Sequence, residues 1–129
     1  MMKILRTIVI PILSAAIWIS ISEFVRNELL FKSYWIHHYQ NLGLAFRSDT
    51  INGMVWGIWS LCFAITIFIF SKKYSLLHTF LLSFFVGFVL MWLAIGNLGV
   101  LPYKLLPFAV PLALIESFVA SYLIKVFKT

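Results

Sequence analysis

The sequence predicts an all-α membrane protein, an antiparallel bundle of four transmembrane helices with an outer interfacial amphipathic helix. Of its 129 residues, 63% are hydrophobic and only 11% are charged, and the mean hydropathy is +1.03. Soluble domains are typically about 45–50% apolar and about 25% charged. A soluble fold of this length could not bury so much apolar surface, whereas a bilayer can cover it.

Four apolar runs are long enough to cross a bilayer, which requires about 20 mostly apolar residues. We place these spans at 7–24, 51–70, 77–100 and 105–126. Strands are excluded because an open sheet leaves its edge groups unbonded in lipid and a barrel needs many short alternating strands. Residues 1–129 therefore form a single integral membrane domain.

The first apolar run also has features of a secretory signal peptide. Lys3 and Arg6 precede it, and Ser14, Ala15 and Ala16 could form a cleavage site. The run continues to Ser22, however, beyond the usual length of a signal core. We expect it to be the first transmembrane helix.

The segment at about 28–46, between the first two spans, predicts a helix on the membrane surface. Its apolar and aromatic residues recur at helical spacing, at Phe31, Tyr34, Trp35, His38, Leu42, Ala45 and Phe46. A helix with one such face lies in the headgroup plane, where Tyr and Trp are favoured.

The basic residues predict that both termini are cytoplasmic. This orientation places Lys3, Arg6, Lys72, Lys73, Lys125 and Lys128 inside and Arg26, Lys32, Arg47 and Lys104 outside. Short cytoplasmic segments carry an excess of Lys and Arg. Because the basic residues stand singly or in pairs at the ends of apolar runs, we expect membrane lipids, and no nucleic acid, as partners.

Glu116 is the strongest candidate for a functional residue. It lies near the middle of the fourth span, where an acid costs roughly 2.5–3.5 kcal/mol on insertion scales. Ala109, Ala113 and Ala120 share its helical face and allow close helix packing. No Lys or Arg lies at a matching depth in the predicted spans, so we expect an inward-facing, protonated carboxyl.

Two interpretations of Glu116 remain open. It could bind a proton, a cation or a cationic ligand, or it could only cement the helices through a hydrogen bond to Asn52, Asn97 or a hydroxyl. Asn97 and Asn52 are accordingly further ligand- or proton-binding candidates. Asn97 also fits the unwinding end of the third span, and Asn52 fits the N-terminal cap of the second.

Two further groups of residues indicate packing or an outer polar site. Gly53 and Gly57 form a GxxxG element that lets helices approach closely, either within the chain or in a dimer. A second group, Glu23, Arg26, His37 and His38, could form a polar site on the outer face, although a salt-bridged helix end explains Glu23 and Arg26 as well. No catalytic motif, metal-ligand spacing or cofactor signature occurs.

Three stretches resemble a group of short bacterial four-span inner-membrane proteins of unknown function. They are Asn52 to Ser60 (NGMVWGIWS), Met91-Trp92-Leu93 with Gly96-Asn97-Leu98, and Pro111-Leu112 with Glu116. The resemblance covers most of the chain and implies a bacterial inner membrane. It implies no activity.

Three functions follow as hypotheses. The first is a structural or accessory protein that packs against a second copy or another membrane protein. The second is a small transporter or ligand-binding protein that uses Glu116. The third, a membrane enzyme with its site on the outer face, is the least supported, and overall we expect no enzyme.

Overall fold

The computed structural model describes residues 1–128, which form helices and links without a β-strand. In chain order the elements are α1 (Met2–Ile4), η1 (Leu5–Val9), α2 (Ile10–Phe24), η2 (Val25–Leu30), α3 (Lys32–Asn41), α4 (Thr50–Lys73), α5 (Leu76–Phe84), η3 (Phe85–Val89), α6 (Leu90–Asn97), η4 (Tyr103–Leu105) and α7 (Leu106–Lys128). The π-helical stretches η1 and η3 each join the α-helices on either side of them, and η2 extends α2 to Leu30, so these segments form long continuous rods.

Four of these rods are long and apolar enough to cross a membrane: Met2–Leu30, Thr50–Lys73, Leu76–Asn97 and Tyr103–Lys128. The prediction of four spanning helices is confirmed to that extent, but their bounds differ. The first rod continues past Phe24 to Leu30 because its polar residues pair with one another along the helix rather than ending it. The third ends at Asn97.

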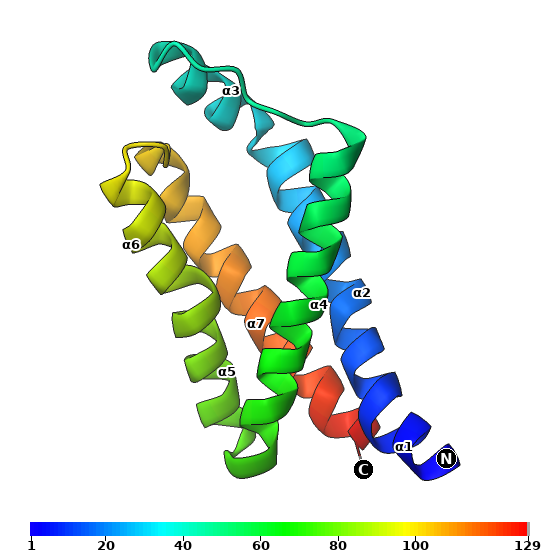
Figure 1. The fold of residues 1–129 in the computed structure, drawn as a ribbon. Helices are drawn as coiled ribbons and strands as arrows, with labels where there is room; N and C mark the ends of the chain where they lie inside the picture. The colour runs from blue at the N-terminus through cyan, green and yellow to red at the C-terminus, as the bar shows by residue number, and fades with distance from the viewer. Residues whose placement is uncertain (129) are drawn as a thin grey trace.

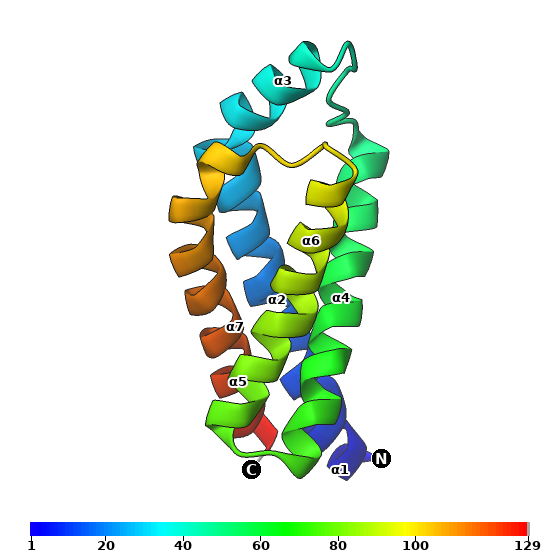
Figure 2. The same cartoon turned by 90° about the vertical axis from the view of Figure 1, so that its left-hand side faces the viewer.

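The rods lie side by side and consecutive rods run in opposite directions (Figures 1 and 2). The α2 helix contacts both α4 and α7, and α5 contacts α4 and α7 as well. Both chain ends and the link between α4 and α5 lie at one end of the molecule. The α3 helix and the link between α6 and α7 lie at the other.

Small side chains allow this close packing. Ala15, Ala113 and Ala120 are fully buried in the main apolar cluster, which also contains Phe63 and Phe88. A Cβ at Gly87 would lie 2.5 Å from ring atoms of Phe63, so the ring would have to shift to admit any larger residue. Many large apolar side chains point outward, as expected of helices that face lipid.

The segment after the first rod contains a shorter helix than the sequence predicts. Helix α3 ends at Asn41, and residues 42–49 are not helical. Gly43 takes a φ of 74°, a left-handed conformation that ends a helix. Phe46 then folds back and stacks on Trp35, with ring centroids 5.9 Å apart.

Candidate functional site

Three ionisable side chains from the first and last rods meet in the interior. Glu23 and Arg26 are three residues apart on the rod that contains α2, and therefore share one face. Glu116 projects from α7 toward them. Glu23 and Arg26 are each only 5% exposed, and Glu116 is fully buried. We call these three residues the triad.

Arg26 is the centre of the triad. One terminal nitrogen of its guanidinium lies 2.5 Å from Oε1 of Glu23. The other donates a hydrogen bond of 3.2 Å to Oε1 of Glu116. The guanidinium carbon also lies 4.9 Å from the centre of the Phe88 ring, a cation–π distance. A single arginine thus bridges two carboxyls from different helices.

Neighbouring side chains hold the triad in place. Asn27 donates its amide to Oε2 of Glu23 at 3.0 Å, and Trp35 of α3 donates its indole N–H to Oδ1 of Asn27 at 3.3 Å. Trp18 donates its indole N–H to the main-chain oxygen of Glu116 at 3.0 Å. These bonds hold the Glu23 side chain from the α3 end of the molecule and the Glu116 backbone from α2.

The triad has one carboxyl more than it has cations. Beyond Glu23 and Glu116, no described residue among 1–128 forms an ion pair with Arg26. Oε2 of Glu116 is buried and accepts no hydrogen bond from any described residue. With both acids ionised, the triad carries one net negative charge, which one proton or one monovalent cation would neutralise.

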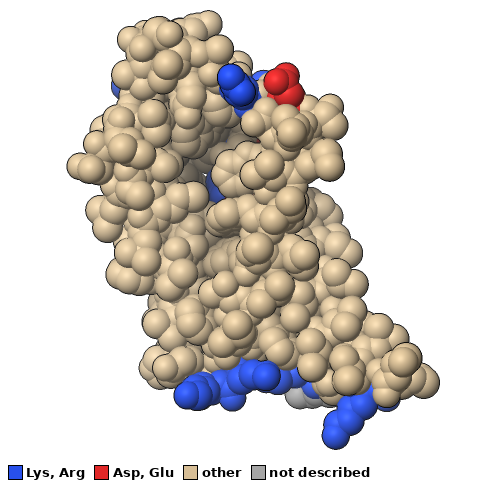
Figure 3. Space-filling model, in the orientation of Figure 1, with Lys and Arg blue, Asp and Glu red and all other residues tan. Residues whose placement is uncertain are grey.

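A hollow in the surface lies at the end of the molecule that carries α3. Figure 3 shows it between the adjoining halves of α4 and α6, with Lys or Arg atoms (blue) at its floor. Trp59, Phe88 and Trp92 form a connected group of aromatic rings, and the Phe88 ring lies against the Arg26 guanidinium.

The Glu116 carboxyl faces inward, on the same buried face as Ala109, Ala113 and Ala120. The structure differs from the sequence-based expectations in what surrounds that carboxyl. The expectation that no base lies at its depth is wrong, because the first rod extends beyond Phe24 and carries Arg26 back toward α7. The packing interpretation allowed a hydrogen bond from Glu116 to Asn52, Asn97 or a hydroxyl, and within residues 1–128 neither asparagine forms one.

The two asparagines lie at helix ends. Asn52 forms a capping box with Asp49 at the start of α4, as its position predicts. Asn97 is the last residue of α6, and Gly99 beyond it has a φ of 79°. Neither side chain is joined to the triad by a hydrogen bond in the described part of the chain.

Gly53 and Gly57 do not pack within the chain. A Cβ built on either glycine would meet no atom within 4 Å, and both residues are exposed. The interpretation of this GxxxG element as an intrachain contact is therefore wrong, because α4 turns that face outward.

The histidines are separate from the triad. His37 and His38 line a groove of about 600 Å³ at the α3 end of the molecule, together with Ser33, Tyr34, Asn41, Pro102, Tyr103 and Lys104. A ring nitrogen of His38 lies 2.7 Å from the main-chain oxygen of Gly99. Glu23 and Arg26 do not line this groove, so the predicted outer-face site divides into two places.

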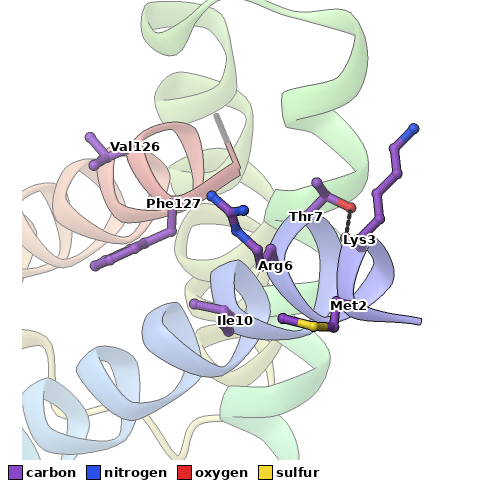
Figure 4. A pocket seen from close by; sticks show the side chains of 7 residues that line it. All are labelled: Met2, Lys3, Arg6, Thr7, Ile10, Val126 and Phe127. Carbon is purple, nitrogen blue, oxygen red and sulfur yellow. Dashed lines mark hydrogen bonds between the residues drawn. The ribbon is translucent and has the colours of Figure 1, made fainter.

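A second groove, of about 520 Å³, lies at the opposite end of the molecule, between the two chain termini (Figure 4). It is lined by the basic Lys3 and Arg6, by Thr7, and by the apolar Met2, Ile10, Val126 and Phe127. In residues 1–128 no three His, Cys, Asp or Glu side chains are close enough to hold a metal ion.

The spacing of Glu23 and Asn27, four residues apart, already places them on one helix face. Sequence reasoning missed Trp18 and Trp35 as supporting residues. A partly buried tryptophan needs a partner for its indole N–H, which was the available signal for both. Comparison with known proteins adds nothing here, because no family model, curated protein or solved structure matches the chain.

Proposed function

We propose that the chain is a multi-pass protein of a bacterial inner membrane, with both termini cytoplasmic. The four apolar rods support a membrane location. In this proposal they form an antiparallel bundle in the bilayer, and α3 lies at the outer interface. The orientation rests on six basic residues at the end that carries both termini. The bacterial assignment rests on the sequence resemblance alone.

Within that membrane, we propose that the triad binds and releases one proton or one monovalent cation. The protein is then a small transporter or ligand-binding protein. The observation that carries the proposal is the surplus carboxyl: two buried acids face a single guanidinium. A simple helix clamp requires only one acid for one base. An unpaired charge inside the membrane is costly. The second carboxylate therefore favours a bound proton or cation that neutralises it.

Arg26 makes such exchange feasible. It can remain paired with either acid while the other gains or loses its proton, because its two terminal nitrogens contact different carboxyls. In this proposal the ion reaches the triad through the hollow between α4 and α6. The Phe88 ring, which already faces the Arg26 guanidinium, would also attract a bound cation.

Infrared difference spectroscopy between acid and alkaline pH tests this proposal on the purified protein in nanodiscs. We expect one buried carboxyl band that titrates in the unaltered protein and is lost in Glu116→Gln. A sodium titration at fixed pH distinguishes a cation from a proton, because a bound cation would displace the protonated band. Glu28→Gln is the matched control, since Glu28 pairs with Lys32 at the surface. A spectrum with no titrating carboxyl contradicts the proposal.

A structural or accessory role is the second candidate, and the open face of α4 favours it. Gly53 and Gly57 lie on this face, and the exposed Met54, Trp56 and Ile58 lie beside them on α4. A second copy or another membrane helix could approach closely there. Crosslinking of cysteines placed at Gly57 in native membranes tests it. Monomeric protein at every expression level contradicts self-association through this face.

A further inference from the structure

We infer that the groove between the two chain termini binds the phosphate headgroup of an anionic phospholipid. The inference rests on the proposed membrane location and not on ion binding by the triad. The first step is the distribution of charge. Lys3, Arg6, Lys72, Lys73, Lys125 and Lys128 all belong to helix ends at one end of the molecule. The other four basic residues equal the four acids in number, so this end accounts for the whole net charge of +6.

Among residues 1–128, no Asp or Glu side chain forms an ion pair with these cations. Glu116, the acid nearest in sequence to Lys125, is nine residues away, about 14 Å along a helix. Lys125 is occupied by the main-chain oxygens of Ser71 and Tyr74, at 3.0 and 2.8 Å. Lys72 and Lys128 both lie over the ring of Phe68. Lys3 and Arg6 are instead the cations that line a groove.

The groove has the two chemical parts that a phospholipid requires. Arg6 projects into the space between the first helical rod and the end of α7 (Figure 4). A guanidinium forms paired hydrogen bonds with phosphate oxygens. Ile10 and Phe127 line the same groove. Phosphate bound by Arg6 would therefore leave the acyl chains beside apolar side chains.

Its location also selects a lipid over a soluble anion. The groove lies at the end of two predicted spans, at headgroup depth, where anionic lipids are concentrated and each nearby Lys or Arg strengthens their attraction. A soluble phosphate would gain nothing from the apolar wall. The same phosphate chemistry is shared by both, so the test includes both.

The test is native mass spectrometry of the full chain in detergent, with phosphatidylglycerol as the probe. We expect Arg6→Gln to lower its retention about fivefold, and Lys3→Gln to lower it by a similar factor. Lys73→Gln is the matched control, because Lys73 is exposed at the same end and does not line the groove. Arg6→Lys keeps the charge but loses the paired hydrogen bonds, so it should retain more lipid than Arg6→Gln and less than the unaltered protein, which guards against misfolding as the cause of a loss.

Three results would overturn the inference. Equal losses in Lys73→Gln and Arg6→Gln would show only diffuse attraction to the basic end. Displacement of the lipid by inorganic phosphate or by glycerophosphoglycerol at equal concentration would show a free-anion site. Equal retention of phosphatidylcholine would show no preference for anionic lipid. Infrared titration of the triad is unaffected by any of these results, so the two proposals can fail separately.

Discussion

The indole of Trp18 donates a hydrogen bond of 3.0 Å to the main-chain oxygen of Glu116, the residue whose side chain accepts from Arg26. The first and last helical rods are therefore joined twice at one residue, once through its backbone and once through its carboxyl. A change in the charge of that carboxyl acts on one of the two joints and leaves the other intact.

The two acids of the triad should be individually dispensable for stability and jointly essential. Glu116→Gln or Glu23→Gln leaves one acid for Arg26, so we expect each to lower the free energy of unfolding by less than about 1 kcal/mol. The double variant leaves a buried guanidinium without a counter-ion, which costs about 3–5 kcal/mol. Thermal unfolding in detergent measures both. Additive losses in the double variant contradict this account.

Replacement of Arg26 should be more severe than that of either acid alone. Arg26→Gln leaves two buried carboxyls with no cation, and we expect a loss of about 3–5 kcal/mol in unfolding free energy. Adding Glu23→Gln to this variant removes one of the two acids and should recover part of the loss. Lys32→Gln, at a surface ion pair, should change stability by no more than about 1 kcal/mol. Equal effects at Arg26 and Lys32 would exclude a buried ionic role.

The glycines should respond to alanine according to their surroundings. Gly87→Ala places a methyl group against the Phe63 ring and should destabilise the protein by about 1–3 kcal/mol. Gly57→Ala meets no atom and should leave the monomer equally stable or more stable, because alanine favours a helix. Parallel thermal unfolding of the two variants tests this contrast. Destabilisation by Gly57→Ala would indicate a contact on the open face of α4.

The proposed orientation can be read by cysteine labelling in intact cells. The exposed Cys62 is first replaced by serine, so that only the introduced thiol reacts. Cysteine at Lys73 should react with an impermeant reagent only after permeabilisation, and cysteine at Gln40 should react without it. The opposite pattern would invert the topology and move the lipid groove to the outer leaflet.

Sequence reasoning identified the two features that a bilayer requires of every spanning helix, a long apolar run and very few acids. Hydropathy was enough to place four helices, and scarcity of acids in membranes was enough to select Glu116. It failed to pair Glu116 with Arg26, because it ended the first span at Phe24 and treated Arg26 as an external residue. The true end at Leu30 depends on hydrogen bonds between side chains, which a hydropathy pattern does not contain. The outward rotation of Gly53 and Gly57 depends on tertiary packing in the same way.

The contact between Trp35 and Asn27 has a further consequence. Helix α3 cannot lift away from the rods without breaking this bond, and Asn27 is also the donor to Oε2 of Glu23. Any displacement of α3 from the rods would therefore change the hydrogen bonding of Glu23, an acid buried below it.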